Sequence, residues 1–160
     1  MPKHSIVQVF LDEVSIIRRS PEAEQERAVA IFDILESNHF APTGDLEGPF
    51  HLHLRIEEHS RLVLDIRSEQ DESLREIGLP LLPLRRLIRD YFQICESYYD
   101  AIKKLTTSQI ETIDMARRGL HNEGSEILAE RLKDFVEVDY ETARRLFTLV
   151  CVLHIRGRSG

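Results

Sequence analysis

The sequence predicts an α+β fold, with a small three-stranded antiparallel sheet and about four helices, the last three of which form the main helical core. Three observations predict it. A short apolar, β-branched run comes first, two later segments alternate between apolar and polar side chains, and the second half repeats apolar residues every three or four positions. The order strand, helix, hairpin and three helices predicts helices packed on one face of the sheet.

The first half of the chain begins with a strand over residues 6–11, which is apolar and bounded by polar residues. A helix is expected from about Pro21 to Asn38, because Ser20 can cap its first turn and proline is favoured at the first helical position. Residues 41–49 contain two prolines and two glycines, and they predict a loop.

A β-hairpin should follow this loop. Alternation over residues 51–56 and 62–67 predicts two half-buried strands, with Leu54 opposite Leu64 or a neighbour two residues along, and a turn at residues 57–61. The outward face of these strands is polar and carries His51, His53, Arg55, Asp65 and Arg67. Residues 69–76 are acidic and without a clear period, so they predict a surface connection.

Three helices are expected in the second half. One runs from about Pro83 to Leu105, and the next begins at a capping box formed by Ser108 and Glu111. It continues to about Phe135 unless a glycine breaks it, and Asp139 can cap the last helix. Residues 1–160 then form one domain, with 157–160 as a frayed tail.

Composition restricts the possible partners. With 28 acidic and 21 basic residues, the formal charge of -7 disfavours non-specific binding to nucleic acid or an anionic membrane, although a compact basic pocket remains possible. Cys95 and Cys151 lie in apolar helical stretches without CxxC spacing, which is typical of reduced, buried cysteines. No apolar stretch approaches a membrane span, so we expect a cytoplasmic protein.

The most informative segment is Arg117-Arg118-Gly119-Leu120-His121-Asn122-Glu123-Gly124-Ser125-Glu126, which places two glycines and several polar residues in an amphipathic helix. Helical spacing aligns Asp114, Arg117, His121 and Ser125 along the edge of the apolar face. Gly124 falls on the packed side, where a missing Cβ allows a close approach, whereas Gly119 faces outward. The helix could also end or kink between the two glycines.

Three interpretations of this segment remain open. In the first, Arg117 and Asp114 form a structural ion pair and His121 hydrogen-bonds a buried tyrosine, Tyr91 or Tyr98. In the second, an anion or phosphodiester pocket uses Arg117 and Arg118 to hold charge and His121 to exchange protons. In the third it is a partner-binding surface. The candidate binding residues are Asp114, Arg118, Asn122, Glu123 and Ser125.

Two other groups of side chains were considered as sites. His51, His53 and Asp65 could converge on a metal, but Arg55 and Arg67 share their face and would repel a dication, so we expect no metal site and no cofactor. The arginine pairs at 85–86 and 144–145, with Arg89, could extend a basic patch around Arg117, or could be ordinary solvated surface. No motif for acyl transfer, nucleoside triphosphates, dinucleotides or zinc proteolysis is present.

Several stretches carry a family resemblance. Arg85 to Tyr99, Arg117 to Glu126 and Ala143 to His154, together with Ala28 to Asp33 and Asn38-His39-Phe40, resemble an uncharacterised protein family of the UPF series found in alphaproteobacteria. The resemblance runs nearly end to end, and it implies a small bacterial cytoplasmic protein without implying a reaction.

A second resemblance covers only the last two helices. An arginine followed by a histidine about one helical turn later, here Arg117 and His121, is similar to HEPN domains, helical bundles whose nuclease members cleave RNA without metal. This resemblance implies that His121 is a general base and that Arg117 stabilises developing phosphorane charge. The N-terminal strands are foreign to such an all-helical bundle.

The sequence therefore favours a non-catalytic cytoplasmic interaction or regulatory protein. Its expected partner is an unknown protein or a small anionic ligand, without a membrane, and a homo-oligomer is possible. The alternative is a metal-independent RNase or phosphodiester-processing enzyme of HEPN-like type centred on Arg117 and His121, in which case RNA is the partner.

Overall fold

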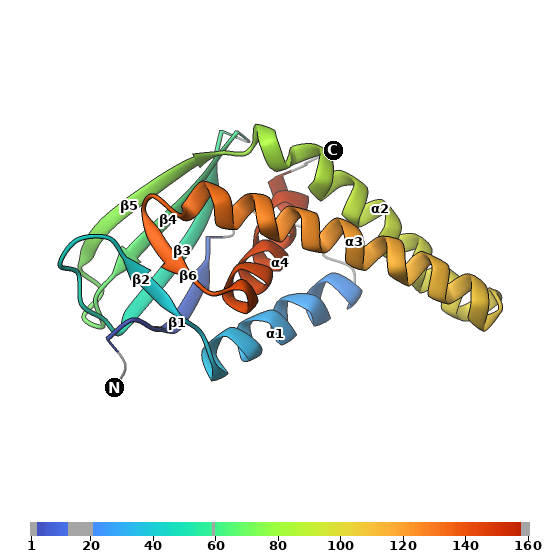
Figure 1. Cartoon of the computed structure of the whole chain (residues 1–160), viewed down its shortest axis with the longest axis horizontal. Helices are drawn as coiled ribbons and strands as arrows, with labels where there is room; N and C mark the ends of the chain where they lie inside the picture. Colours follow the sequence, from blue (N-terminus) through green and yellow to red (C-terminus); the bar gives the residue numbers. More distant parts are fainter. Residues whose placement is uncertain (1–2, 13–20, 59, 158–160) are drawn as a thin grey trace.

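The computed structural model describes residues 3–12, 21–58 and 60–157 of the chain and confirms the α+β class. One side of the molecule is a four-stranded sheet in the order β1 (Ile6–Leu11), β3 (Phe50–Glu57), β4 (Arg61–Arg67) and β5 (Ser73–Pro80). The helices lie on one face of this sheet (Figure 1), and they are α1 (Pro21–Glu36), α2 (Leu82–Lys104), α3 (Thr107–Leu132) and α4 (Tyr140–Gly157). The predicted Ser20 cap and the tail beyond Gly157 lie outside the described residues.

The sheet is mixed, so the predicted three-stranded antiparallel arrangement is wrong. β1 runs parallel to β3, with Leu11 beside Leu54, whereas β3, β4 and β5 are antiparallel to their neighbours. The reason is the connection between β1 and β3, which contains the whole of α1. A helical crossover returns the chain to the end of the sheet at which β1 begins, so that β3 can run parallel to β1. A short turn cannot make this connection.

The second correction concerns the segment expected to connect at the surface. Residues 73–80 form the edge strand β5, in which Ile77 and Leu79 are buried and the intervening side chains point outward. Charged residues are usual on an edge strand because they discourage pairing with other chains. The acidic composition therefore led to the prediction of a surface connection where the structure has a strand.

A separate two-stranded sheet was not predicted at all. β2 (Phe40–Pro42) and β6 (Val136–Val138) pair antiparallel and bring the chain after α1 against the chain after α3. Each has three residues, which is too short for alternation to be recognised. β6 also explains why α3 ends at Leu132 rather than at about Phe135.

The hairpin register agrees with the prediction. Leu54 lies opposite Leu64 and His53 opposite Asp65, which keeps the leucines on the helix-covered face and the polar residues on the other. Asp65 is only 2% exposed. Its carboxylate accepts hydrogen bonds from Arg67 at 2.8 Å and from the Ser73 hydroxyl at 3.0 Å, and these compensate for the loss of water. The polar side chains around Asp65 on the outward face thus satisfy one another by hydrogen bonds within the sheet.

The helix ends follow local capping chemistry. α3 begins with a capping box at Thr106 and Gln109 rather than at the predicted Ser108 and Glu111, because the link from α2 is only two residues long. Asp139 caps α4 as predicted, since its carboxylate accepts from the Thr142 amide at 3.0 Å. Asn38, which was expected to end α1, instead follows it and bonds the backbone of Ile6 at 2.8 and 2.9 Å. This contact fixes α1 against β1.

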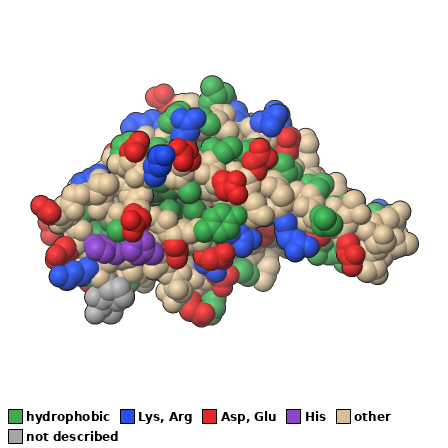
Figure 2. All heavy atoms as spheres, in the orientation of Figure 1, with side chains coloured by type: hydrophobic (Ala, Val, Ile, Leu, Met, Phe, Trp, Pro, Cys, Tyr) green, Lys and Arg blue, Asp and Glu red, His purple; other side chains and the backbone are tan. Residues whose placement is uncertain are grey.

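α4 lies at the centre of the molecule, between the sheet and the other helices (Figure 1), and its residues from 146 to 153 are almost all buried. α2 and α3 form a long antiparallel pair that projects beyond the body at one side (Figure 1). Acidic and basic side chains are interspersed over the face drawn in Figure 2, without an extended patch of one sign. No helix in the described part of the chain is long and apolar enough to cross a bilayer.

Candidate functional site

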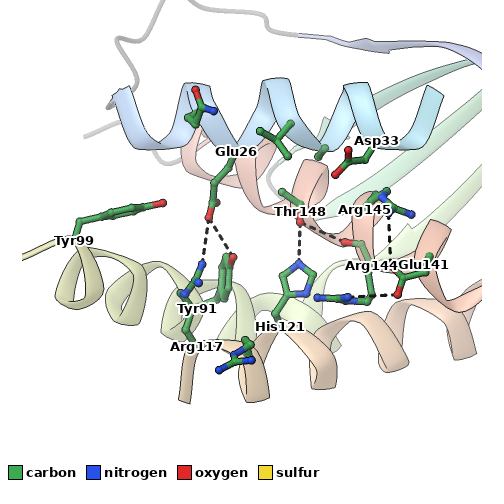
Figure 3. Close-up of a pocket in the computed structure, with 14 residues that line it drawn as sticks. Glu26, Asp33, Tyr91, Tyr99, Arg117, His121, Glu141, Arg144, Arg145 and Thr148 are labelled. Atoms are coloured by element: carbon green, nitrogen blue, oxygen red, sulfur yellow. Dashed lines mark hydrogen bonds and ion pairs between the residues drawn. The ribbon is translucent and has the colours of Figure 1, made fainter. Parts of the chain in front are cut away.

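A cleft of about 450 Å³ lies where the four helices converge (Figure 3). α1 forms one wall, and α2, α3 and α4 form the floor and the opposite wall. The side chains that line the cleft are mainly polar, and they include Arg117 and His121, the candidate catalytic pair. The full lining consists of Gln25, Glu26, Val29, Ala30, Asp33, Tyr91, Tyr99, Arg117, Arg118, His121, Glu141, Arg144, Arg145 and Thr148.

Helical periodicity brings these residues to one place. Arg117 and His121 are one turn apart on α3, and Arg144 and Thr148 are one turn apart on α4, so each pair shares a face of its helix. α3 and α4 are packed closely because Gly124 lies against the Phe147 ring, where a Cβ would come within 2.2 Å of Cζ. The predicted packing role of Gly124 is therefore confirmed.

α3 runs without interruption through both glycines, so the alternative in which it ends between them is wrong. Gly119 faces open space, as predicted, and an added Cβ would meet nothing within 4 Å. The continuous helix is what keeps Arg117 and His121 in register.

Arg117 is held from three sides. Its guanidinium donates to Asp114 Oδ1 from Nη2 at 2.6 Å and from Nε at 3.1 Å, which confirms the predicted ion pair. It also lies 4.4 Å from the centroid of the Tyr98 ring and 4.0 Å from the Glu26 carboxylate across the cleft. Burial is the largest single influence and lowers the pKa of Arg117, but the hydrogen bonds with Asp114 and the electrostatic interactions with nearby groups together outweigh it and raise that pKa. Arg117 is therefore a fixed positive charge.

His121 does not bond a tyrosine, so that part of the prediction is wrong. Its Nε2 is 2.8 Å from the Thr148 hydroxyl, and the ring packs between Tyr91 and Phe147, each 5.3 Å away by centroid. Because the Thr148 hydroxyl donates to the Arg144 carbonyl at 3.3 Å, its oxygen is left to accept from a protonated Nε2. Burial, aided by Arg144 and Arg117, lowers the pKa of His121 to about 4, so the ring is neutral at pH 7.

Glu26 brings a carboxylate into the same cleft from α1. The Tyr91 hydroxyl donates to Glu26 Oε1 at 3.3 Å, and this explains where the buried tyrosine finds its partner. Burial raises the pKa of Glu26 more than Arg117 and Tyr91 lower it. Burial likewise raises the pKa of the nearby Cys95 thiol to about 12, so this cysteine is not a nucleophile at neutral pH.

The arginines of α4 are less completely paired than Arg117. Arg144 and Arg145 share one carboxylate, that of Glu141, at 3.4 and 3.5 Å. The Nε of Arg144 is buried, and no described residue accepts a hydrogen bond from it. A guanidinium has five N–H donors, so both side chains keep donors for another acceptor.

The remaining residues of the predicted set divide into three groups. Arg118 lines the cleft and pairs with Asp114 at 2.9 Å, so Asp114 bridges the two neighbouring arginines. Ser125 is fully buried and its hydroxyl donates to the His121 carbonyl at 2.7 Å, which is a structural contact. Asn122 and Glu123 are exposed and do not line the cleft.

The two alternatives for the arginine pairs, a basic patch around Arg117 or ordinary solvated surface, divide between the pairs. Arg144 and Arg145 join Arg117 and Arg118 around the cleft, whereas residues 85, 86 and 89 do not line it. Sequence reasoning missed Glu26 and Asp33, whose seven-residue separation places them on the same side of α1 as the buried Ala30. The seven-residue spacing of these two acids could have indicated that both lie on the inward side of α1.

A smaller hollow of about 180 Å³ lies on the polar face of the sheet, near His53 and Asp65. The His53 ring stacks on Phe10 at 4.6 Å between centroids and its Nε2 is 3.3 Å from the Asp71 carboxylate. Within the described residues, no group of three or more histidines, cysteines or carboxylates is placed to hold a metal ion.

Comparison with known proteins gives a consistent result. A family model described as "Uncharacterised protein family (UPF0262)" matches residues 3–156. A UPF0262 protein of Paramagnetospirillum magneticum is 54% identical over 97% of this chain and 98% of its own length. One of Rhodospirillum rubrum is 57% identical over 95% and 93%, and one of Brucella canis is 58% identical over 98% of each chain. No solved structure matches this chain.

Proposed function

Since the chain belongs to the uncharacterised protein family UPF0262, we propose a function from the geometry of its cleft: this protein is a non-catalytic, regulatory binding protein. Its ligand is a small anion held in the four-helix cleft by arginines of α3 and α4. Both cysteines are free and buried, which supports a reducing, cytoplasmic location.

The observation that carries this proposal is the convergence of four arginines on one cleft. Arg117 and Arg118 share Asp114, and Arg144 and Arg145 share Glu141, so each pair holds more positive charge than its own carboxylate neutralises. The chain as a whole has a formal charge of -7, yet these four guanidinium groups gather on the α3 and α4 side of one cleft. Guanidinium groups bind phosphate and carboxylate oxygens bidentately, and a half-enclosed site screens the interaction less than open water does.

The geometry of His121 argues for binding rather than catalysis. The Nε2 atom is engaged by Thr148, and a pKa of about 4 makes the imidazole a weak base at neutral pH. A general base is most effective when its pKa is near the working pH. The ring therefore acts as a neutral wall that fixes α3 against α4.

Inorganic phosphate is a suitable first probe. We expect phosphate to raise the melting temperature of the wild type, and Arg145→Gln to weaken phosphate binding about tenfold or more, because a hydrogen-bonded charge pair contributes about 1.5–3 kcal/mol. The matched control is Arg89→Gln, since Arg89 is on α2 and does not line the cleft. Calorimetric titration measures both affinities at constant ionic strength. The same phosphate affinity in Arg145→Gln as in wild type would exclude this site.

The alternative function is a metal-independent RNase of HEPN-like type. It is based on one observation, that Arg117 and His121 line the same cleft, one helical turn apart. In this case the imidazole of His121 adopts the other neutral tautomer, with its proton on Nδ1, so that Nε2, once released from Thr148, accepts the proton of the attacking hydroxyl, and Arg117 stabilises the phosphorane. A nuclease cleaves a set of single- and double-stranded RNAs in chelator, and His121→Gln abolishes cleavage while the fold is retained. The absence of cleavage by the wild type removes this alternative.

A further inference from the structure

The two sides of the cleft differ in charge. Every arginine that lines it comes from α3 or α4, whereas α1 contributes two carboxylates, Glu26 and Asp33 (Figure 3). A site that bound only an anion would gain nothing from acids on the facing wall, because they repel the ligand. The cleft therefore has a basic side and an acidic side.

The acidic side is not used up by internal ion pairs. Both contacts of the Glu26 carboxylate are to the same oxygen, one from Tyr91 at 3.3 Å and one to Arg117 at the long distance of 4.0 Å. The structure gives the Asp33 carboxylate no hydrogen bond or ion pair with any described residue. Both groups thus keep acceptor capacity directed at the cleft.

The charged form of Glu26 moreover lowers the stability of the folded protein, because the carboxylate is partly removed from water. Its side chain is 17% exposed, and burial raises its pKa despite the nearby guanidinium. A carboxylate in this environment is stabilised by a ligand that brings a positive charge and several N–H donors to it. A primary ammonium has three such donors.

We propose that the ligand of the cleft is a small zwitterion, with a phosphate or carboxylate group bound by the arginines of α3 and α4 and a primary ammonium group bound on the acidic side by a carboxylate of α1, that of Glu26 or of Asp33. This inference rests on the proposed anion site and adds the class of ligand. A volume of about 450 Å³ accommodates a molecule of amino-acid size or somewhat larger, together with water.

Two probes of equal size separate the zwitterion from the simple anion. Phosphoethanolamine and n-propyl phosphate have the same number of heavy atoms and differ in whether the chain ends in an ammonium or a methyl group. Calorimetric titration of the wild type should show phosphoethanolamine binding at least tenfold more tightly, a difference of about 1.4 kcal/mol, because only this probe can form a hydrogen-bonded ion pair with a carboxylate of α1.

The double variant Glu26→Gln, Asp33→Asn should lose this preference while binding n-propyl phosphate at least as tightly as the wild type does, because both substitutions keep the side-chain shape and remove charges that repel an anion. Glu36→Gln is the control, since this exposed residue of α1 does not line the cleft and should leave the preference unchanged. Circular dichroism of each variant confirms that α1 stays folded.

The outcomes distinguish the two proposals. Equal affinity of the wild type for both probes overturns the zwitterion and leaves the anion site standing, and so does a preference that survives the double variant. Failure of both probes to bind overturns the anion site and, with it, the inference made here.

Discussion

His121 is a partly buried histidine that the fold keeps neutral at pH 7, and this makes the protein sensitive to acid. In the folded state its pKa is about 4, below the ordinary value of 6.5, so between these two values the unfolded chain binds the proton more readily. The contribution of His121 to stability is therefore complete above pH 6.5 and is lost as the pH falls toward 4. Glu26 acts in the opposite direction, because its pKa is raised.

The first prediction follows from this sign. His121→Gln should reduce the acid destabilisation between pH 6.5 and pH 4 by about 1–3 kcal/mol, a range that allows for the partial exposure of the ring. Urea denaturation of both proteins at half-unit pH intervals measures the difference. If both proteins lose stability with the same slope over this range, the imidazole is not buried as described.

The individual residues of the site were only partly predictable from sequence. The pair of Arg117 with Asp114 followed from their three-residue spacing on one helix, and the structure contains it at 2.6 Å. The partner of His121 could not be predicted in the same way, because Thr148 is 27 positions away on another helix. Local periodicity shows which residues share a face, but it does not show which face of another element they meet.

Among the elements, α3 depends on two glycines with different roles. Gly124 is buried against Phe147, which is itself fully buried and has no room to move, whereas Gly119 faces open space. Glycine lowers helix stability relative to alanine at both positions. Only at Gly124 does close packing compensate for that loss.

The second prediction compares these glycines directly. Gly119→Ala should stabilise the protein by about 0.5–1 kcal/mol through helix propensity, and Gly124→Ala should destabilise it by about 1–3 kcal/mol because the new Cβ overlaps the Phe147 ring. Chemical denaturation of the two variants beside the wild type gives both values. Destabilisation of similar size at both positions would mean that α3 and α4 do not approach each other at Gly124.

Element ends were predicted to within a few residues where capping residues are distinctive, as at Asp139. They were less accurate at the start of α3, where Thr106 with Gln109 and Ser108 with Glu111 offer competing capping boxes. The sequence could not decide between these two because the choice depends on how tightly α2 and α3 are joined.

On the scale of the whole molecule, the class of fold was predictable and the topology of the sheet was not. Alternation identified β3 and β4 and their register, since a shift of one residue would have exposed Leu54 and buried His53. The direction of β1 relative to β3 depends on how α1 crosses the sheet between them. The edge strand β5 was not recognised because its charged residues are typical of a surface loop. Both are set by tertiary arrangement, which no local pattern records.

The same arrangement forms the candidate site. α1 crosses over the sheet between β1 and β3 and then packs on α4, so Glu26 and Asp33 face arginines more than 80 positions later in the chain. A cleft of this kind belongs to the tertiary fold, and this is why sequence analysis identified its α3 side and not its acidic wall. The functional account therefore depends on anion binding at this place and not elsewhere on the surface.

Histidine NMR at pH 7 tests that claim most directly. Inorganic phosphate is titrated at constant ionic strength while the imidazole Hε1 resonances are followed, with the signal of His121 assigned from His121→Gln. Because His121 has a pKa of about 4, its resonance at pH 7 responds to binding and not to small changes of pH. The account predicts a saturable shift of His121 that requires about tenfold more phosphate, or more, in Arg145→Gln, with His53 on the opposite face of the sheet unchanged. A His121 resonance that does not move, or shifts of equal size in both histidines, would contradict it.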